Sequence, residues 1–316
     1  MIADFVPQTH IKGCFLAKNK QILKNKNGKD YHSLRLQDES GIIDSKIWAF
    51  HSAIEPYQSD DVVYVEGEVI LFLDQPQLNI FKIRPAKEDE YTLANLIPHT
   101  KKDIQQLEES LYLFIDSVKN NDIKRLLEAI FLDENINEKF LTKPAAKSIH
   151  HAYLSGLLEH CITVTKIGVY LSEFYENVNR DLVIAGCLLH DIGKIEELSG
   201  FPENEYTDSG QLLGHIVLGT NKIAIEISKL DNFSPEIANL IMHILISHHG
   251  ELQYGSPEVP KCIEAMIVHL ADYSDSRIKM FEEILLTTKD AKYSGFNKIL
   301  NRNIRNSNYE QQKNQN

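Results

Sequence analysis

The stretch Gly186-Cys187-Leu188-Leu189-His190-Asp191-Ile192-Gly193-Lys194 decides the fold class, because an apolar helical run ends there in an adjacent His and Asp. Consecutive residues on a helix point about 100° apart, so such a pair meets at one metal ion only near a helix end. An ionised Asp beside buried leucines costs several kcal/mol unless it is paired or bound to a cation. The stretch therefore predicts a buried helix whose end carries a paired or cation-bound carboxylate.

Charge is distributed unevenly along the chain. The 316 residues carry a net charge of −12, yet residues 1–87 are neutral, with 11 Lys and Arg against 11 Asp and Glu. An acidic chain argues against a protein that coats nucleic acid, but no acid lies between Asp4 and Asp30, where lysines cluster. These are Lys12, Lys18, Lys20, Lys24, Lys26 and Lys29. We expect two or three domains, with a locally basic front and an acidic back.

Cysteine usage and hydropathy indicate the compartment. The four cysteines are widely spaced and form no Cys-x-x-Cys pair, which suits a reducing cytosol better than a disulfide framework. The N-terminus lacks a basic region followed by an apolar core, and no run approaches the ~20 apolar residues of a membrane span. We therefore expect a soluble, cytoplasmic protein that makes no membrane contact.

Residues 13–85 carry the signals of strands and turns. Asn27-Gly28 is a strong hairpin signal, and residues 31–37 alternate with a period of two. A turn at Asp38-Glu39-Ser40-Gly41 precedes a strand that runs to Trp48, a short helix is expected at 53–57, and strands follow at 62–70 and 77–83. Five strands with one helix between the third and fourth is the order of an OB-fold barrel.

Residues 13–85 resemble the nucleic-acid-binding OB domains of the tRNA-anticodon type, and the domain is expected to span residues 1–87. The resemblance rests on Gly28-Lys29, residues 34–37, Asp38-Glu39-Ser40-Gly41 and Ile47-Trp48. Such barrels bind single strands with a basic groove and with aromatics on which bases stack. The residues it implies for nucleic-acid binding are Lys24, Lys26, Lys29, Tyr31, Tyr64 and Phe72, with Phe81 as a further platform. The alternative left open is a solvated lysine face and aromatics that fill the barrel.

Helical patterns dominate the rest. Residues 88–147 are expected to form a linker with paired helices. Their apolar stripe is consistent with core packing, and a homo-oligomer that uses it as an interface is the alternative. An all-α bundle is expected over 148–295, with helices at 148–175, 181–191, 209–230, 235–250 and 259–285. The polar tail 296–316, rich in Asn and Gln, is expected to be disordered.

The histidines gather in the helical part. Nine of the thirteen lie between residues 150 and 270. A lone His is more often structural than a ligand, but here several predicted helices each bring one ligand residue or pair, which is how a bundle builds a two-metal site. These are His160, His190-Asp191, His215, His248-His249 and Asp272.

This order of His, His-Asp, His, His and Asp resembles the HD-domain superfamily of metal-dependent phosphohydrolases. The segments 156–160, 190–194, 213–219, 248–257 and 264–272 narrow the resemblance to the YhaM family of 3′-to-5′ exoribonucleases, which combine an N-terminal OB domain with a C-terminal HD domain. One departure is visible. After the final Asp the family reads close to Asn-Leu-Asp-Ala-Lys, whereas this chain has Tyr273-Ser274-Asp275-Ser276-Arg277.

The resemblance implies a role for each of these residues. Two divalent ions, first of all Mn²⁺ with Co²⁺, Fe²⁺ or Ni²⁺ as alternatives, are expected. One ion is held by His160, His190, Asp191 and Asp272, and the other by Asp191, His215, His248 and His249. Asp191 and Lys194 are the expected catalytic residues, and His150, His151 and Arg277 the expected substrate contacts.

The expected activity is 3′-to-5′ degradation of single-stranded RNA, with single-stranded DNA as a second substrate, to nucleoside 5′-monophosphates by two-metal-activated hydroxide attack on the phosphodiester. Two alternatives remain. One is an HD phosphohydrolase that acts on small nucleotides or cyclic dinucleotides, and the other is a single-strand-binding protein without catalysis.

Overall fold

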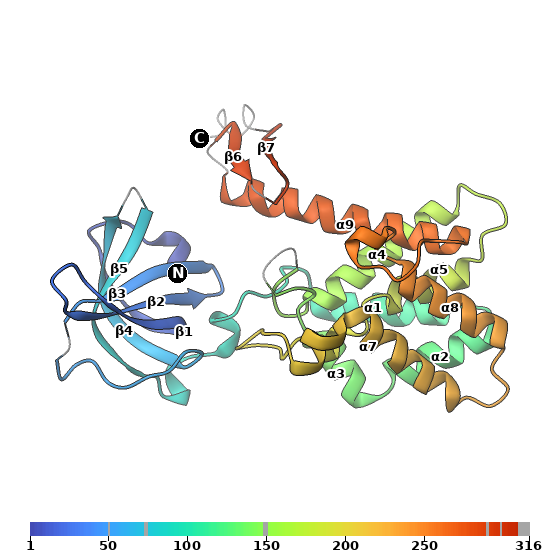
Figure 1. Ribbon diagram of the computed structural model, residues 1–316, viewed down its shortest axis with the longest axis horizontal. Helices are drawn as coiled ribbons and strands as arrows, with labels where there is room; N and C mark the ends of the chain where they lie inside the picture. Colours follow the sequence, from blue (N-terminus) through green and yellow to red (C-terminus); the bar gives the residue numbers. More distant parts are fainter. Residues whose placement is uncertain (50, 73–74, 148–150, 289–290, 298, 309–316) are drawn as a thin grey trace. The chain divides into compact units, whose positions relative to one another are not determined.

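The computed structural model describes the chain except for residues 50, 73–74, 148–150, 289–290, 298 and 309–316 (Figure 1). It divides into two compact units, Met1–His99 with Gly200–Asn204, and Thr100–Ser199 with Glu205–Asn316. The first unit is a β-barrel and the second is mainly helical, and each has a hydrophobic core of its own. The barrel unit extends to His99 rather than to the expected boundary at residue 87.

The barrel is closed by five strands in the order β1-β2-β3-β5-β4. They are β1 (His10–Lys24), β2 (Asp30–Asp38), β3 (Gly41–Ile47), β4 (Val62–Phe72) and β5 (Gln75–Pro85). β1 pairs with both β2 and β4, and β3 closes the barrel on β5 in parallel. This is the OB-fold predicted from the strand order.

Alternation builds the barrel interior. Val63, Val65 and Val69 of β4 are fully buried while their neighbours are partly exposed. The β2–β3 turn is held by Asp38, whose Oδ1 accepts from the backbone N–H of Ser40 at 2.8 Å and whose Oδ2 accepts from Ile2 N–H at 2.7 Å. The alternating valines therefore define the inside of the barrel, and Asp38 holds one of its corners.

Two local predictions in the barrel had different outcomes. The Asn27-Gly28 hairpin is confirmed, with Gly28 at φ +76° in the turn between β1 and β2. The helix expected at 53–57 is not formed, and Ile54 instead makes an isolated bridge to Ile83 of β5. Pro56 explains the difference, because proline disfavours the helical conformation of the residue before it.

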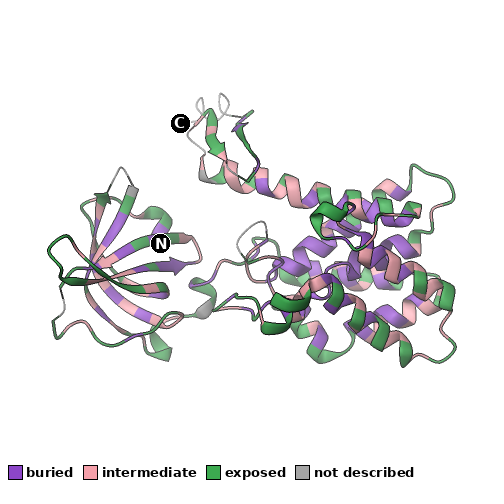
Figure 2. Ribbon diagram, viewed as in Figure 1, coloured by how far each residue is buried: buried purple, intermediate pink, exposed green. Residues whose placement is uncertain are grey.

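The second unit is built from nine helices of the described chain. Three precede the site: α1 (Ile104–Asp116), α2 (Asn121–Phe131) and α3 (Glu134–Thr142). The remaining six are α4 (Gly156–Ser172), α5 (Arg180–Leu189), α6 (Lys194–Glu197), α7 (Asp208–Ser228), α8 (Pro235–Ser247) and α9 (Ile263–Thr287). Helix α5 is buried from Leu182 to Leu189, and α4 and α9 pack against it (Figure 2). Short 3₁₀ turns lie at Ile2–Asp4, Glu88–Glu90, Leu93–Asn95 and Leu252–Tyr254.

Polar caps set where three of these helices begin. The side chains of Asn179, Thr207 and Ser234 accept backbone N–H groups in the first turns of α5, α7 and α8. Such caps satisfy donors that a helix start leaves unpaired. Each cap sets the residue at which its helix begins, and therefore which residues lie on each face at the other end of that helix.

The chain after α9 forms a β-hairpin, β6 (Tyr293–Asn297) and β7 (Arg302–Arg305), where disorder had been expected from residue 296 onward. Leu300 and Ile304 are buried in a small cluster with Met280 of α9. The Asn-rich composition hid these two apolar anchors. Residues 309–316 of the expected tail lie outside the described residues.

The described helices include none that combines the length and apolar character needed to cross a membrane. All four cysteines, Cys14, Cys161, Cys187 and Cys262, are free thiols.

Candidate metal centre

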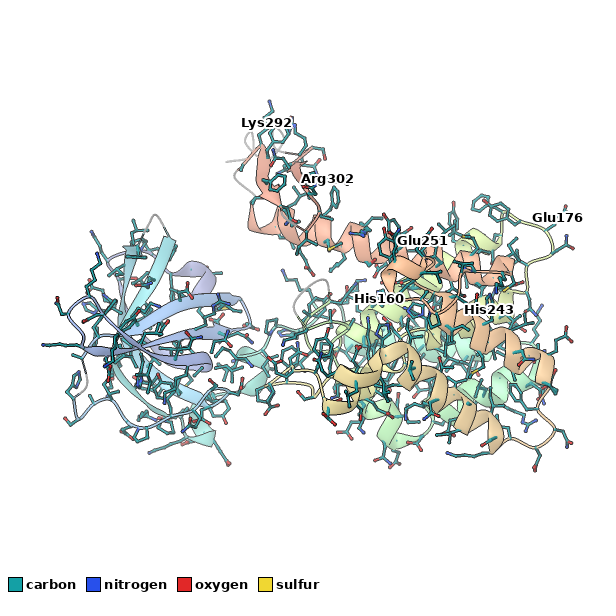
Figure 3. All side chains as sticks on the ribbon, viewed as in Figure 1. His160, Glu176, His243, Glu251, Lys292 and Arg302 are labelled. Atoms are coloured by element: carbon teal, nitrogen blue, oxygen red, sulfur yellow. The ribbon has the colours of Figure 1, made fainter. Side chains whose placement is uncertain are left out.

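The predicted ligand residues converge in the helical unit from five helices or their ends. His160 lies on α4, the His190-Asp191 pair directly follows α5, and His215 lies on α7. The pair His248-His249 directly follows α8, and Asp272 lies on α9. His160 is only 2% exposed in the interior of the bundle (Figure 3). As expected from the opening stretch, His190 caps α5 and Asp191 leaves the helix, so both side chains reach one place.

One cluster of donor atoms surrounds Nε2 of His160. This atom lies 3.2 Å from His190 Nε2, 3.5 Å from Asp191 Oδ2 and 3.3 Å from Asp272 Oδ1. His160, His190 and Asp272 form a group whose donor atoms all lie within 4.8 Å of one another. Four side chains that are distant in sequence therefore point donor atoms at one small volume.

A second cluster lies across Asp191. His215, His248 and His249 form another group with donor atoms within 4.8 Å of one another. Oδ1 of Asp191 lies 3.5 Å from His215 Nε2 and 3.8 Å from His248 Nε2. The two carboxylate oxygens of Asp191 thus face different clusters, Oδ2 the first and Oδ1 the second.

Three buried atoms of this second cluster have no hydrogen-bond partner within the described part of the chain. They are Asp191 Oδ1, His215 Nε2 and His248 Nε2. Leaving a buried polar atom unsatisfied costs about 1–3 kcal/mol. A divalent cation would satisfy all three, so the residues fit a metal site. Their imidazole and carboxylate atoms suit Mn²⁺, Fe²⁺, Co²⁺ or Ni²⁺, and the groups of potential ligands among the described residues contain no Cys.

The other nitrogen of each imidazole is held from behind. Nδ1 of His190 lies 2.9 Å from the carbonyl oxygen of Cys187, and Nδ1 of His248 lies 2.7 Å from that of Leu245. Nδ1 of His249 lies 2.9 Å from Tyr254 O, and Nδ1 of His215 lies 3.1 Å from Glu197 Oε1. A donating Nδ1–H leaves the Nε2 lone pair free for a cation.

Asp275, which the sequence did not single out, contacts the Nδ1 of His160 in the same way. Its Oδ2 lies 2.7 Å from His160 Nδ1 and 2.9 Å from His151 Nε2. His151, expected to contact substrate, is 1% exposed and lies behind His160 instead. The signal was present, because Asp275 lies three residues after Asp272 and so shares its helix face. His150, the other expected contact, lies outside the described residues.

Lys194 is part of the same buried network. It begins α6, and its Nζ lies 2.6 Å from Asp191 Oδ2 with the side chain 13% exposed. Burial raises the pKa of Asp191, but the ammonium of Lys194 and the neighbouring histidines outweigh this and hold that pKa well below its usual value. Burial likewise lowers the pKa of Lys194, and Asp191 reverses the shift, so that the net pKa is raised.

The imidazoles differ in their protonation. Burial, with a smaller contribution from His249, lowers the pKa of His248 well below its usual value, which keeps its Nε2 unprotonated. Burial also lowers the pKa of His160, but hydrogen bonds to Asp191, Asp272 and Asp275 raise it well above its usual value. A cation at this site must therefore displace a proton from His160.

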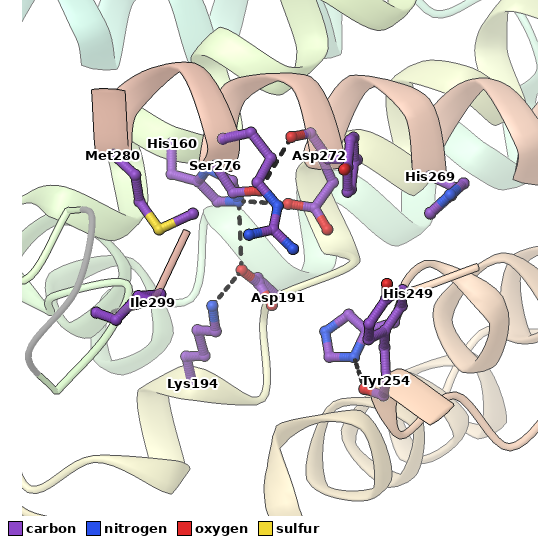
Figure 4. Close-up of a pocket in the computed structure, with 12 residues that line it drawn as sticks. His160, Asp191, Lys194, His249, Tyr254, His269, Asp272, Ser276, Met280 and Ile299 are labelled. Atoms are coloured by element: carbon purple, nitrogen blue, oxygen red, sulfur yellow. Dashed lines mark hydrogen bonds and ion pairs between the residues drawn. The ribbon is translucent and has the colours of Figure 1, made fainter. Parts of the chain in front are cut away.

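A cavity of about 330 Å³ opens beside the first cluster (Figure 4). His160, Asp191, Lys194 and Asp272 form one part of its lining. The rest includes Tyr254, Tyr273, Arg277, Met280 and Ile299. Arg277, an expected substrate contact, does line the cavity, with its guanidinium 5.2 Å from the centre of the Tyr273 ring. Cationic and aromatic groups thus stand next to the ligand atoms.

The barrel residues predicted to bind nucleic acid fall into different settings. Lys24, Lys26 and Lys29 are exposed at the β1–β2 hairpin, where Lys24 pairs with Asp30 at 3.1 Å. Phe72 at the end of β4 is 56% exposed, and Phe81 on β5 is 41% exposed. The Tyr64 ring is covered by Arg84, with the guanidinium 4.4 Å from the ring centre.

Tyr31 has a partner that the sequence analysis did not single out. Its ring stacks on Trp48, with 4.7 Å between ring centroids and 23° between planes. Trp48 is 48% exposed, and its Nε1 donates to Asn79 Oδ1 at 3.0 Å. Lys46 Nζ lies 5.9 Å from the Tyr31 ring centre. From the sequence, Trp48 was predicted only to end a strand, although it is the single Trp of the chain.

Residues 157–277 match the family model described as HD domain. The helical unit therefore contains an HD domain, and the whole ligand set lies within the matched residues. Among solved structures, the chain is similar to the second OB-fold domain of replication protein A from Methanococcus maripaludis, with 20% identity over 28% of this chain and 94% of that chain and a TM-score of 0.22. It is also similar to a chain of a replication protein A heterotrimer bound to ssDNA, with 18% identity over 25% of this chain and 58% of that chain and a TM-score of 0.21. The strand order of the barrel itself, and not these low-scoring likenesses, defines the OB-fold.

Proposed function

We propose that the protein is a metal-dependent exonuclease that degrades single-stranded RNA, and secondarily single-stranded DNA, from the 3′ end. The observation that carries the hydrolytic part is the set of three buried, unpartnered atoms on Asp191, His215 and His248, among the described residues, of which Asp191 also lines the open cavity. The direction of digestion rests on the resemblance of the motifs to the YhaM family.

The metal ligands fall into two sets that share Asp191. His160, His190 and Asp272 with Asp191 would hold one ion, and His215, His248 and His249 with Asp191 would hold the other. Two observations support this division. The two carboxylate oxygens of Asp191 face different clusters. In addition, Nδ1 of His190 and of His248 lies at hydrogen-bond distance from a backbone carbonyl oxygen. When bound, the pair of ions supplies Lewis-acid activation of water and of the phosphodiester.

Two cationic side chains of the cavity bind phosphates of the strand. Lys194 Nζ is fixed against Asp191 and lines the cavity, so it needs no rearrangement to place positive charge there. The Arg277 guanidinium lines the same cavity, and its planar fork suits two phosphate oxygens at once. We assign Lys194 to the scissile phosphate and Arg277 to a neighbouring phosphate.

The cavity suits one terminal nucleotide. A volume of about 330 Å³ lies at the small end of the range for ligand pockets. Tyr254 and Tyr273 in its lining supply aromatic surface for a base, and the buried ligand clusters form its other side. The cavity therefore takes one unit of a polymer at a time.

The test is a time course with Mn²⁺ and a 5′-labelled single-stranded RNA, comparing wild type with Asp191→Ala. The matched control is Asp231→Ala, which removes an exposed carboxylate after α7. We expect a ladder that shortens from the 3′ end with wild type and with the control, and no ladder with Asp191→Ala.

Other outcomes select the alternatives. Turnover of free nucleotides or cyclic dinucleotides without cleavage of the strand indicates a small-molecule phosphohydrolase. Binding of the strand without cleavage under Mn²⁺, Co²⁺, Fe²⁺ or Ni²⁺ indicates a single-strand-binding protein. Either result contradicts the proposal.

A further inference from the structure

The β6–β7 hairpin that follows α9 is a basic element in an acidic chain. Residues 291–308 carry four Lys and Arg and no Asp or Glu, whereas the whole chain has a net charge of −12. Lys292, Arg302 and Arg305 are exposed, and with the residues that the structure describes these three form no ion pair. Figure 3 labels Lys292 and Arg302 on this hairpin. Their charges are therefore available to an anionic partner.

A bulge places two aromatic rings on one side of the hairpin. Tyr293 pairs with Arg305 and Phe296 pairs with Asn303, and the register shifts between these pairs. Residues three apart in a regular strand point to opposite faces, but one extra residue brings them to the same face. Gly295 permits this bulge with φ at +76°. We call Tyr293, Phe296, Asn303 and Arg305 the hairpin face, since directly paired residues share a side.

Packing does not explain the aromatic rings of this face. Ile304, which alternates with Asn303 and Arg305, is 3% exposed and belongs with Met280 to the cluster that anchors the hairpin on α9. On the other side, Tyr293 is 53% and Phe296 64% exposed. The Arg305 guanidinium lies 5.4 Å from the Tyr293 ring centre. Exposed rings interleaved with cations match the surface that single strands need, where bases stack and phosphates pair with Lys or Arg.

The hairpin also reaches the cavity of the metal centre. Ile299, which lies between β6 and β7, is part of the cavity lining together with Met280 of α9. The cavity of the metal centre therefore extends to the turn of the hairpin. The relation to the cavity favours the substrate over an unrelated partner as the occupant of this face.

We propose that the hairpin face is a binding site for single-stranded nucleic acid. Unpaired bases stack on Tyr293 and Phe296, while Arg305 contacts a phosphate. The site holds the strand whose end occupies the cavity, and it is independent of base identity because every base has a π face. The inference rests on the proposed function, since it takes the strand to be the substrate.

The test measures binding without cleavage. Fluorescence anisotropy of a labelled single strand with phosphorothioate linkages, which resist hydrolysis, gives the Kd for the Mn²⁺-loaded full chain and its variants. Phe296→Ala should weaken binding about fivefold or more. Arg305→Gln should lower the slope of log Kd against log salt by about 0.7, the value for one phosphate contact on a single strand.

Matched controls lie elsewhere on the helical unit. Phe174→Ala removes a ring that is 63% exposed after α4, and Arg180→Gln removes an exposed guanidinium at the start of α5. Both should bind the strand as wild type does. Phe296→Trp and Arg305→Lys keep ring and charge, and they should restore affinity, which separates a lost contact from a misfolded hairpin.

A second readout separates this inference from the proposed function. Turnover of bis(4-nitrophenyl) phosphate, a diester too small to reach the hairpin, should be unchanged in Phe296→Ala and Arg305→Gln. Wild-type affinity in both variants overturns the hairpin site even if the enzyme digests RNA. A shift in oligomeric mass by light scattering, with unchanged strand affinity, also overturns it and assigns the face to a second copy of the chain. If wild type digests no strand, the proposed function fails whatever the hairpin binds.

Discussion

Oδ2 of Asp275 lies 2.7 Å from Nδ1 of His160, so the carboxylate holds the imidazole on the side opposite the ligand cluster. The same oxygen holds His151 at 2.9 Å, and the hydroxyl of Tyr153 lies 2.8 Å from the other nitrogen of His151. An imidazole held in this way keeps one tautomer and one orientation. Asp275 is therefore a positioning residue for the first cluster.

Asp275→Asn should weaken binding of Mn²⁺ without removing any ligand. The amide keeps the shape of the side chain but loses the negative charge that polarises His160, and loss of such a partner typically costs about 10- to 100-fold in metal affinity. Titration calorimetry on metal-free protein measures this Kd. Asp231→Asn is the control and should leave the Kd unchanged, and an unchanged Kd in Asp275→Asn would show that His160 needs no support.

Gly193→Ala should destabilise the helical unit. A Cβ on Gly193 would lie 2.0 Å from the carbonyl oxygen of His215 and 2.5 Å from the backbone nitrogen of Gly219, so α7 would have to move away from Asp191. Overpacking of this kind typically costs about 1–3 kcal/mol. Urea denaturation measures the loss of unfolding free energy, and Mn²⁺ calorimetry measures the displaced His215. Gly41→Ala in the barrel is the control, because its nearest new contact would be at 3.9 Å; equal stability of the two variants would contradict the close approach.

Glu90 should titrate at unusually low pH. Hydrogen bonds from Arg84 and then from the Lys87 backbone lower its pKa from 4.5 to about 2. Since the folded-state pKa is depressed, these bonds stabilise the fold above the ordinary pKa, and the contribution is lost as pH falls toward 2. NMR titration of the Glu90 carboxyl carbon measures the value. Arg84→Gln should return it toward 4.5, while Lys82→Gln, whose lysine pairs with Glu66 instead, should not; a normal value in wild type would refute the pairing.

Trp48 should report strand binding by the barrel. It is the single Trp of the chain and stacks on Tyr31, so a base that displaces or extends this stack changes its fluorescence. Trp48→Ala should weaken single-strand affinity by about 1–3 kcal/mol, the usual contribution of one stacked base. Trp48→Phe should restore part of it, and Leu71→Ala, which removes an exposed aliphatic side chain of β4, should have no effect. Unchanged fluorescence at saturating strand would exclude this face.

Much of the fold was readable because its signals are local. The Asn27-Gly28 turn and the alternation in 31–37 predicted the first hairpin of the barrel, and the helical patterns of the sequence predicted the helices. The helix expected from residue 148 begins only at Gly156. There His151 and Ser155 adopt positive φ angles of 57° and 62°, which no periodicity shows.

Other features depend on contacts between distant residues. The role of Asp275 depends on its packing across from α4, 115 residues away in sequence, so only its spacing from Asp272 was visible. The hairpin after α9 was missed because Leu300 and Ile304 are isolated apolar residues in a polar segment, and their burial needs Met280. The stack of Tyr31 on Trp48 likewise joins β2 to the residue that follows β3. Single residues of this kind leave no period to detect.

Helix α9 sets the relative positions of several residues of the metal centre and of the hairpin. Asp272, Asp275, Arg277 and Met280 lie along one rigid helix, and the hairpin is attached at its far end. One residue inserted between Arg277 and Met280 would rotate everything beyond it by about 100° and advance it by about 1.5 Å. The ligand clusters would be untouched, yet Met280 and the hairpin would face another direction. Length changes in this helix are therefore constrained by its rotation of about 100° per residue, because only an insertion close to a whole number of turns keeps the hairpin facing the same side.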